Sequence, residues 1–564
     1  MIILGVCDNH DSGVCIYRDA ELLFAVNEER LSRKKLQGGF PYLSIQECLR
    51  FTGINPSDVD VVVLASRMTP TAVLRLFSSW HDSLRHSRSS FSYFLNIYII
   101  YQVIAHYLKF PEFLDEFFSR QIVGYRLARL GIRAPVHCVA HHKAHATGAY
   151  YSGGTTDKTL IFTLDAMGDG VSVTVNIGCG RDVERVYEQS GFSTISTYYS
   201  RLTEFLGFAP LRHEGKITSL AAYGHRNQKI LALARTNLSF AEKTGGFICK
   251  NHFIPEDLNS GLYGQLKGYS KEDVAFNFQK NFEDEIVKFI SWWVAKTGVF
   301  RISLSGGVFA NVSLNHRIKG ISSVESVHVF PHMGDGGLAV GAALGFIKPV
   351  PVLLKNVYLG PQYDNDLIRA YLKSNSIAHE FLDEEPLCEK VADLLAQGRT
   401  VGHFNGRMEF GPRALGNRSI LYQANDPSAM DWLNKKMDRS SFMPFAPVSL
   451  DFEADNLYRN IDNVRNALRF MTVAVDGTDK LKQSCLAATH IDGTARPQLL
   501  SREDNPRLYR ILEHYERRKG VATVLNTSFN RHEEPIVCSF QDALRSFKEC
   551  ALDALVLNNF LIYK

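Results

Sequence analysis

The residues best suited to hold a metal are two histidines four positions apart, His141 and His145, in the stretch VAHHKAHATGAYY. Residues i and i+4 share one face of a helix, so both imidazoles can reach one ion. The glycine-rich turns LDAMGDG and HMGDGG add the carboxylates of Asp165, Asp169 and Asp335. Two histidines with one or two carboxylates suit a first-row divalent metal that holds a substrate oxygen. The alternative is that the histidines form only a solvated or capping pair.

A third histidine, His10, lies in the acidic turn NHDSG between two apolar stretches. An imidazole titrates near neutral pH, so His10 could accept the proton of an attacking hydroxyl. In the competing interpretation the turn is structural, and Asn9 and Asp11 shape its backbone.

Arginines gather in glycine-punctuated loops of the C-terminal part of the chain. Guanidinium groups stay charged and bind phosphate oxygens in pairs, so these loops predict a phosphate site, with a solvated basic surface as the alternative. The segment VLNTSFN adds neutral hydrogen-bonding groups after a strand-like run. The residues concerned are Arg407, Arg413, Arg418, Arg439, Asn526, Thr527, Ser528 and Asn530.

The elements that must position these residues alternate between strands and helices, which predicts an α/β fold. Two hairpin-like segments, at the N-terminus and at 159–178, suggest an internally duplicated domain of actin-like architecture with its ligand between the halves. The strand RISLSGG ends in Gly-Gly before a helix, which lets backbone N–H groups approach a phosphate. Residues 69–132 are predicted to form a mainly helical insertion. Prolines around 348–362 predict a boundary between domains 1–350 and 351–564.

Composition limits the classes of protein to consider. The chain has 564 residues, 22% charged and 45% hydrophobic, as in soluble globular proteins. A net charge of +4 gives no electrostatic case for nucleic acid or an acidic membrane. Scattered cysteines and the lack of a signal-peptide pattern predict a cytoplasmic protein. The uncharged stretch 91–108 is interrupted by polar residues, so we expect a buried or partner-facing helix instead of a membrane span.

Many ordered motifs then resemble one family, the O-carbamoyltransferases of the nodulation protein U type, which carbamoylate natural products. The resemblance runs nearly end to end. The motifs are NEERLSRKK near residue 27, HHKAH at 141, LDAMGDG at 164, HEGKITSLAAYG at 213, LSGGVFAN at 304, GDGG at 334, GRMEFGPRALGNRSI at 406, FMPFAP at 442 and LNTSFN at 525.

The resemblance implies an actin-like (ASKHA) N-terminal domain similar to the tRNA threonylcarbamoyladenosine transferase, followed by a YrdC-like α/β domain. It implies that the second domain makes carbamoyl adenylate from carbamoyl phosphate and ATP, with Mg²⁺. The first domain would then pass the carbamoyl group to a hydroxyl of a small molecule, with iron(II) or another divalent metal holding the adenylate.

Residue roles follow from the same resemblance. The metal ligands would be His141, His145, Asp165 and Asp335, and His10 would be the base. Lys35, Glu214 and Lys216 would lie near the intermediate or acceptor, and Gly306, Gly307 and Asn311 would shape a nucleotide pocket. ATP and carbamoyl phosphate would be bound by Arg418, Arg439, Arg496, Ser528 and Asn530, with Lys435 or Lys436 as a further phosphate ligand.

Two other functions compete with this one. A tRNA-modifying threonylcarbamoyl transferase is disfavoured by the missing basic excess and by the order of the two domains. A nucleotide-binding regulatory module without chemistry would be expected to lack the histidine pair or the arginine loops, and both are present. The expected partners are therefore small molecules, with neither nucleic acid nor membrane. The helical, aromatic stretch 69–130 is a candidate cover for the acceptor pocket or a homodimer contact.

Overall fold

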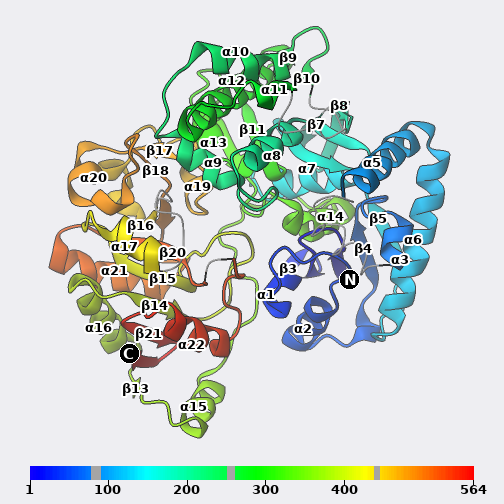
Figure 1. The fold of residues 1–564 in the computed structure, drawn as a ribbon. Helices are drawn as coiled ribbons and strands as arrows, with labels where there is room; N and C mark the ends of the chain where they lie inside the picture. Colours follow the sequence, from blue (N-terminus) through cyan, green and yellow to red (C-terminus); the bar gives the residue numbers. More distant parts are fainter. Residues whose placement is uncertain (78–90, 193, 251–260, 437–444, 532) are drawn as a thin grey trace. The chain divides into compact units, whose positions relative to one another are not determined.

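The computed structural model describes residues 1–77, 91–192, 194–250, 261–436, 445–531 and 533–564. They form two compact units (Figure 1). The first contains Met1–Glu28 and Leu36–Leu354, and the second contains Glu29–Lys35 and Lys355–Lys564. The single boundary predicted near residue 350 places residues 29–35 in the first domain, whereas they belong to the second unit.

That short segment is tied to the second unit by two arginines. Arg30 donates to the carbonyl oxygen of Gly411 at 2.8 Å, and Arg33 donates to that of Ile536 at 2.7 Å. These contacts join residues that are far apart in the sequence, so no local pattern predicts them. From its position in the chain, the segment is expected in the first domain.

The first unit contains a five-stranded sheet in the order β3-β2-β1-β4-β5. Strands β1, β2 and β3 are antiparallel neighbours, and β4 and β5 run parallel to β1. The runs IILGVC of β1 and VVVLA of β4 are almost entirely buried, as expected for strands covered on both faces. The bounds are β1 (Ile2–Cys7), β2 (Gly13–Arg18), β3 (Glu21–Asn27), β4 (Val61–Ala65) and β5 (Val136–Val139).

A second five-stranded sheet of the same unit has the order β12-β11-β6-β7-β8. Strands β6, β7 and β8 are antiparallel neighbours, and β11 and β12 run parallel to β6. Order and direction thus repeat those of the first sheet, as an internal duplication requires. The bounds are β6 (Thr159–Gly168), β7 (Val171–Cys179), β8 (Asp182–Ser190), β11 (Arg301–Ser305) and β12 (Ser326–Val329).

Two helices lie between these sheets: α7 (His141–Tyr151) and α14 (Leu338–Ile347). Helix α7 packs on β6 and β11, α14 packs on β1 and β4, and the two helices pack on each other. Their backbones approach closely at Gly341, where a Cβ atom would lie 2.0 Å from the carbonyl oxygen of Ala144. The small residues of LAVGAALG therefore let two central helices meet.

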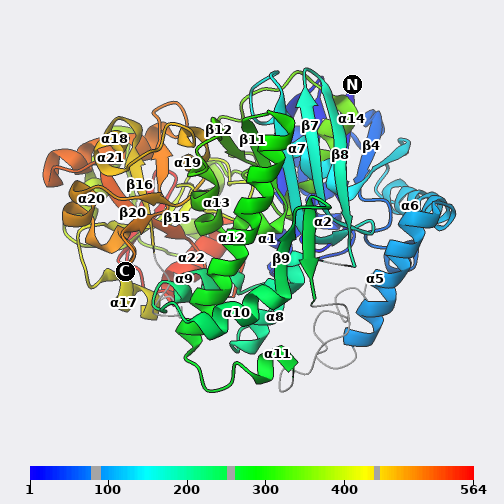
Figure 2. The ribbon, with the colours of Figure 1, turned by 90° about the horizontal axis from the view of Figure 1, so that it is seen from above.

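The remaining helices of the first unit cover its sheets and edges. The predicted helical insertion contains α3, α5 and α6; α3 and α5 each pack on α6, and α6 packs on β5. Helix α12 runs beside α9, α10 and β9 (Figure 2). The bounds are α2 (Tyr42–Thr52), α3 (Ala72–Leu76), α5 (Phe91–Leu108), α6 (Phe110–Ala128), α8 (Ile195–Phe205), α9 (Glu214–Ala221), α10 (Gln228–Asn237), α12 (Lys271–Thr297), α13 (Val312–Lys319), β9 (Leu238–Ala241) and β10 (Gly246–Cys249).

The second unit is built on an eight-stranded mixed sheet in the order β13-β22-β21-β14-β15-β20-β16-β19. Its bounds are β13 (Glu380–Phe381), β14 (Val401–Phe404), β15 (Arg418–Gln423), β16 (Ala446–Leu450), β19 (Gln498–Leu500), β20 (Thr523–Ser528), β21 (Ala554–Leu557) and β22 (Phe560–Tyr563).

Helices pack on this sheet and on one another. Helices α16 and α21 contact each other, and α22 contacts β14 and β21. Both units are therefore mixed α/β, as predicted. Within the described ranges no helix has the length and apolar character needed to cross a membrane. The helix bounds are α15 (Asn365–Ser374), α16 (Glu384–Ala396), α17 (Ala429–Lys436), α20 (Asp479–Ser484), α21 (Pro506–Lys519) and α22 (Phe540–Glu549).

Candidate metal centre and active site

Four residues of the first unit gather into a buried group of metal-ligating atoms: His141, His145, Asp165 and Asp335. One ligand atom from each lies within 4.8 Å of the others. The histidines are one turn apart on α7, Asp165 is in β6, and Asp335 opens the turn that leads into α14. The duplicated sheets and their two central helices thus bring together the four residues named from the sequence.

The chemistry of this group fits a divalent cation. His141 Nε2 lies 3.1 Å from Asp165 Oδ2 and 3.6 Å from Asp335 Oδ1. His145 Nε2 lies 3.5 Å from Asp335 Oδ1 and 3.7 Å from Asp165 Oδ2, and it has no hydrogen-bond partner among the described residues. A buried imidazole nitrogen that lacks a hydrogen-bond partner and faces two carboxylates is typical of a metal ligand.

Two serines hold the opposite ring nitrogens. Ser66 Oγ lies 3.1 Å from His141 Nδ1, and Ser305 Oγ lies 3.0 Å from His145 Nδ1. Ser305 donates its hydroxyl proton to the carbonyl oxygen of Met333 at 3.2 Å, so His145 Nδ1 is the donor to Ser305. This fixes the tautomer in which His145 Nε2 carries the lone pair.

When no cation is bound, electrostatic interactions among these groups determine which of them are protonated. Burial disfavours protonation of His145, but Asp165 and Asp335 outweigh it and raise its pKa to about 9. Burial likewise opposes ionisation of Asp335, yet its interactions with His10 and His141 hold the pKa of this carboxyl below its ordinary value. The carboxylates stay ionised and a cation competes with protons for the imidazoles.

Asp169, one of the three candidate carboxylates in the sequence, is not part of the metal group. Its carboxylate accepts the backbone N–H groups of Arg67 at 3.0 Å, Met68 at 2.8 Å and His141 at 2.8 Å. Its backbone has a left-handed φ of 52° and its own N–H donates to Thr69 Oγ1. Asp169 therefore ties the loop after β4 to the start of α7, which positions His141.

His10 lies in the turn between β1 and β2, beside the metal group. His10 Nδ1 is 3.0 Å from Asp335 Oδ2, and Asn9 donates to the same oxygen at 3.2 Å. The two oxygens of Asp335 thus have separate tasks, since Oδ1 faces the imidazoles of α7. The side chain of His10 is 36% exposed and that of Asp335 is 3% exposed, so a ligand in solvent can reach the histidine.

A buried ion pair that the sequence did not suggest anchors this turn. Arg75 Nε donates to Asp8 Oδ2 at 2.9 Å, and the exposed fractions of the two side chains are 0% and 1%. The same guanidinium donates to Ser119 Oγ at 2.7 Å and to the carbonyl oxygen of Arg67 at 2.9 Å. Removal of either partner would leave a buried charge uncompensated.

The two glycines predicted to shape a nucleotide pocket lie against Leu164 and Asp165 of β6. Gly306 has a φ of 105°, and a Cβ atom there would lie 2.1 Å from the carbonyl oxygen of Leu164. Gly307 donates its N–H to Asp165 Oδ1 at 3.1 Å. Asn311 caps α13 by accepting the N–H of Leu314 at 3.1 Å.

The three other predicted residues near the intermediate lie in different places. Glu214 and Lys216 are on α9 of the first unit, whereas Lys35 belongs to the second unit. Glu214 accepts the N–H of Leu211 at 2.5 Å, and burial raises its pKa. Lys216 Nζ lies 5.6 Å from the ring centre of Phe208.

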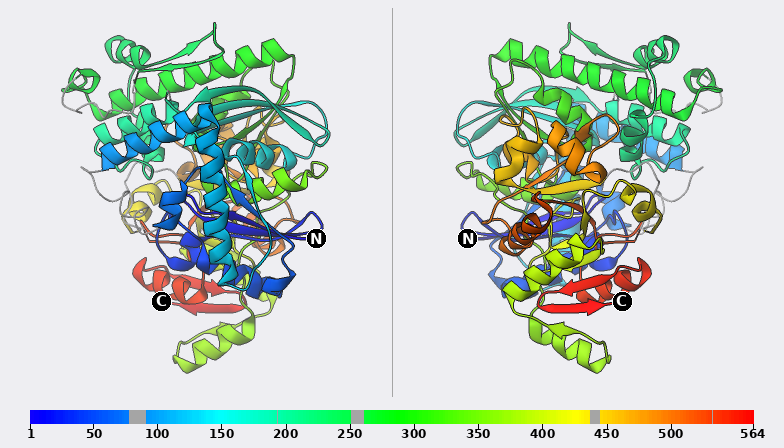
Figure 3. Two further views of the ribbon diagram at one scale, coloured as in Figure 1. Left: turned by 90° about the vertical axis from the view of Figure 1, so that its right-hand side faces the viewer. Right: turned by 90° about the vertical axis from the view of Figure 1, so that its left-hand side faces the viewer.

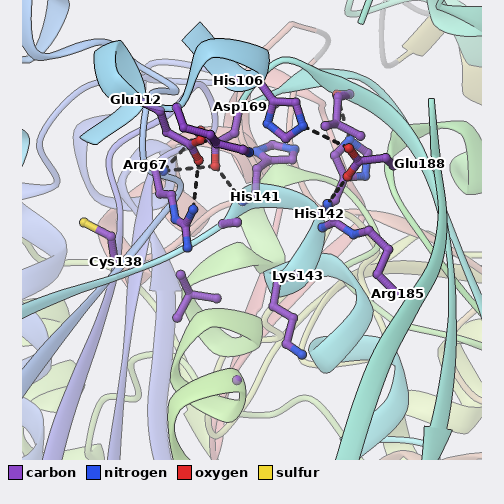
Figure 4. A pocket seen from close by; sticks show the side chains of 16 residues that line it. Arg67, His106, Glu112, Cys138, His141, His142, Lys143, Asp169, Arg185 and Glu188 are labelled. Atoms are coloured by element: carbon purple, nitrogen blue, oxygen red, sulfur yellow. Dashed lines mark hydrogen bonds and ion pairs between the residues drawn. The ribbon is translucent and has the colours of Figure 1, made fainter. Parts of the chain in front are cut away.

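A cavity of about 520 Å³ adjoins the metal group at His141 (Figure 4). Several of its charged lining residues pair with one another: Arg67 with Glu112 at 2.8 Å, His106 with Glu188 at 3.0 Å, and Arg185 with Glu188 at 2.7 Å. Of the four metal-group residues, His141 alone lines this cavity.

In the second unit, two of the predicted arginines bind protein carbonyls. Arg418 is fully buried and stacks 3.7 Å from the ring centre of Phe404. Its guanidinium donates to the carbonyl oxygens of Asn405, Gly406, Asn417 and Pro361. Arg407 donates to the carbonyl oxygens of Leu359 and Gly360. These two side chains hold the glycine-rich loop in shape.

Arg413 in the same loop is different. Among the described residues its guanidinium makes no hydrogen bond or ion pair, whereas those of Arg407 and Arg418 donate to carbonyl oxygens. Burial lowers its pKa to about 10, and no carboxylate of the described ranges raises it again. A partly buried cation without a counter-charge is ready to receive an anion.

The loop that carries Arg413 is built around Glu409, which the sequence did not single out. Glu409 Oε1 accepts the N–H groups of Leu415, Asn417 and Arg418 at 2.8, 2.7 and 3.1 Å. The sequence gives little indication of this role, because a single glutamate between a methionine and a phenylalanine belongs to no recognisable pattern.

The polar residues of β20 lie beside this loop. Asn526 donates to the carbonyl oxygen of Ala414 at 3.2 Å, and Ser528 pairs in register with Ser419 of β15. Asn530 donates to the carbonyl oxygen of Glu534 at 2.7 Å. The strands therefore bring Asn526 next to the Arg413 loop.

The remaining basic candidates of the second unit are spread out. Lys435 is exposed at the end of α17, and Lys436 donates to Thr400 Oγ1 at 3.4 Å. Arg496 is half-buried between β18 (Thr494–Ala495) and β19. Arg439 lies outside the described residues.

Comparisons with known proteins agree with this architecture. Family models described as Carbamoyltransferase N-terminus and Carbamoyltransferase C-terminus match residues 2–344 and 392–564. Nodulation protein NolNO of Sinorhizobium fredii is 30% identical over 98% of this chain and 79% of its own. The 3'-hydroxymethylcephem-O-carbamoyltransferase of Streptomyces clavuligerus is 30% identical over 43% of this chain and 44% of its own. A crystal structure of full-length HypF in the phosphate- and nucleotide-bound form has a TM-score of 0.34 at 14% identity, covering 62% of this chain and 55% of that one.

The matched residues span most of both units, and the resemblance stated from the motifs is confirmed. The chain is a transferase, and it belongs to the carbamoyltransferase family of the nodulation protein U type.

Proposed function

We propose that this chain is an ATP-dependent O-carbamoyltransferase that works in two steps. First, carbamoyl phosphate and water give carbamate and phosphate, and a carbamate oxygen attacks the α-phosphorus of ATP with release of pyrophosphate. Second, the acceptor's hydroxyl oxygen attacks the carbonyl carbon of the resulting carbamoyl adenylate. The products are a carbamate ester and AMP, and the hydroxyl proton passes to a base.

The observation that carries this proposal is the contact between His10 and Asp335. His10 Nδ1 lies 3.0 Å from Asp335 Oδ2, which favours the tautomer with the proton on Nδ1. His10 Nε2 is then the basic nitrogen, and it would take the proton of the acceptor hydroxyl. Because the same carboxylate faces His141 and His145 through Oδ1, the base lies beside the candidate metal group.

His141, His145, Asp165 and Asp335 would hold iron(II) or another first-row divalent cation. Such a cation, when bound, supplies Lewis-acid stabilisation of negative charge on an oxygen of the carbamoyl group. The chain itself contributes the burial that keeps water from these four ligands. It also contributes Ser66 and Ser305, which orient the two imidazoles.

For the first unit we propose an actin-like (ASKHA) fold over residues 1–350, supported by the repeated strand order around α7 and α14. In this arrangement Gly306, Gly307 and Asn311 border the adenylate. Lys35, Glu214 and Lys216 would approach the intermediate or the acceptor.

For the second unit, residues 351–564, we propose a YrdC-like domain that forms carbamoyl adenylate. Both of its substrates are polyanions, and ATP would enter with Mg²⁺. Arg413 is the best-supported ligand because its partly buried guanidinium has no counter-charge among the residues that the structure describes. The wider set of proposed ligands and loop-positioning residues is Arg407, Arg418, Lys435, Lys436, Arg439, Arg496, Asn526, Ser528 and Asn530.

The acceptor is proposed to be a hydroxylated small molecule, as the name of the cephem carbamoyltransferase suggests for that relative. Metal-loaded protein, ATP and ¹³C-labelled carbamoyl phosphate should be incubated with a panel of hydroxylated natural products. We expect one acceptor to gain a labelled carbamoyl group in mass spectra, dependent on ATP. Transfer of the label without ATP would contradict the adenylate route.

A further inference from the structure

Helices α5 and α6 of the first unit carry their apolar residues on the exposed side. On α6 these are Phe110, Phe113, Leu114, Phe117, Phe118 and Tyr125, with exposed fractions of 68%, 65%, 38%, 48%, 53% and 68%. Their spacing of three, four and seven positions gives one stripe along a helix.

On α5 four of the exposed apolar residues follow the same spacing, Ile100, Ile104, Tyr107 and Leu108, with exposed fractions of 41%, 47%, 63% and 65%. We call these four residues and the α6 stripe together the apolar face. Figure 3 shows the two helices in the foreground of its left view.

The polar residues of the same helices face inward. Gln102, Glu112, Asp115 and Ser119 are buried. Gln102 accepts from Thr69 Oγ1 at 2.9 Å, and Asp115 accepts the N–H of Ala72 at 2.7 Å. Over residues 110–119 the amphipathicity of α6 is thus reversed relative to an ordinary surface helix, whose apolar stripe faces the core, whereas Val123 and Leu127 further along the helix are buried.

The apolar face is too large to be ordinary surface. With ~200 Å² for a fully exposed aromatic side chain, the exposed fractions amount to roughly 700 Å² on α6 and roughly 400 Å² on α5. The largest apolar patch of a typical monomer is about 300–600 Å². A standard protein interface buries about 800 Å² on each partner, so this face has the area that a stable dimer needs.

Charge at the edge of the face favours a second copy of the chain over an anionic membrane. Among the described residues of α5 and α6, the exposed cations Lys109 and Arg120 are paired with Glu112 and Glu116. A membrane-surface helix would present lysines and arginines to anionic headgroups. A nearly charge-free face instead lets identical surfaces meet without like-charge repulsion.

We propose that the apolar face is a homodimer interface, formed isologously about a two-fold axis. The inward side of α6 contacts the segment that follows Ser66: Glu112 binds Arg67, Asp115 binds Ala72 and Ser119 binds Arg75. Ser66 itself contacts His141, and Arg75 contacts Asp8. Dimerisation therefore supports the elements that position the metal group. The proposal does not depend on the chemistry assigned to either unit.

Sedimentation velocity of the full chain over a wide concentration range tests this proposal. We expect wild type to sediment as a dimer and Phe113→Glu/Phe117→Glu as a monomer with unchanged circular dichroism. The control Val352→Glu/Ile491→Glu adds the same charge at residues that are 69% and 62% exposed elsewhere, and it should remain dimeric. If the glutamate variant is misfolded, the milder Phe113→Ser/Phe117→Ser should weaken the dimer at least tenfold.

Three results would overturn the proposal. Wild type that is monomeric at every concentration leaves the face without a second copy. A folded Phe113→Glu/Phe117→Glu variant that stays dimeric places the interface elsewhere. Monomeric wild type that floats with phosphatidylglycerol vesicles, when the variant does not, assigns the face to a lipid surface.

Discussion

His10 Nδ1 lies 3.0 Å from Asp335 Oδ2, while Oδ1 of the same carboxylate faces the histidines of α7. One aspartate thus connects the candidate base with the candidate metal ligands. The role of His10 as a base can therefore be tested by mutation. Asn9 makes the same contact with Asp335 but cannot act as a base.

His10→Gln should leave pyrophosphate release intact and slow carbamoyl transfer by about 100-fold or more, since the proton acceptor is lost. Asn9→Ser is the matched control, because Asn9 also donates to Asp335 Oδ2 but cannot accept the proton. Single-turnover transfer should fall by less than about threefold in this control. Equal losses in both variants would show that only the position of Asp335 matters.

Metal affinity should rise with pH. The carboxylates raise the pKa of His145 to about 9, so a cation must displace a proton below that pH. We expect affinity for cobalt(II), followed by its visible absorption, to increase about tenfold per pH unit up to pH 9. His145→Asn should bind weakly and lose this slope, and a flat profile in wild type would contradict the proton competition.

The same group predicts a pH dependence of stability for the metal-free protein. The pKa of His145 is raised from 6.5 in the unfolded chain to about 9. Its contribution is fully present below pH 6.5 and is lost as the pH rises through 9, at most about 3 kcal/mol. Urea unfolding of wild type and His145→Asn should diverge at low pH and converge near pH 9. Parallel curves would contradict this assignment.

Asp169→Asn should weaken metal binding although Asp169 is not a ligand. The substitution removes the charge that holds the N–H groups of Arg67, Met68 and His141. We expect cobalt(II) affinity to fall about 10- to 100-fold and unfolding free energy to fall by about 1–3 kcal/mol. Asp157→Asn, at an aspartate that is 63% exposed, should change neither quantity. Unchanged affinity in Asp169→Asn would remove its positioning role.

Arg413→Ala and Arg418→Ala should differ in stability. Arg413 has no counter-charge within the described part of the chain, so its removal should abolish pyrophosphate release with little loss of unfolding free energy. Arg418→Ala would leave four carbonyl oxygens without their donor, so we expect a loss of roughly 3 kcal/mol together with activity. Normal pyrophosphate release by Arg413→Ala would exclude it as a substrate ligand.

The metal group was predictable because its signal is local. The HHKAH spacing fixes one helix face, and the glycine-rich turns around Asp165 and Asp335 let short side chains reach inward. The glycine-rich turn also brings the carboxylate of Asp169 inward, but backbone N–H groups meet it there.

The supporting contacts were not predictable, because they join distant parts of the chain. Ser66 lies 75 residues from His141, and Ser305 lies 160 residues from His145. Serines are too common to stand out until the sheets place them. The reversed faces of α6 were also hidden, since periodicity shows that a helix has two faces but not which one is buried.

The adenylate step is the central claim, and the phosphate products test it most directly. Metal-loaded wild type should be given ATP and carbamoyl phosphate without acceptor, and pyrophosphate and phosphate should be measured together. The account predicts that both form in equal amounts and that neither forms with Arg413→Ala. Phosphate without pyrophosphate from folded, metal-loaded protein would contradict it.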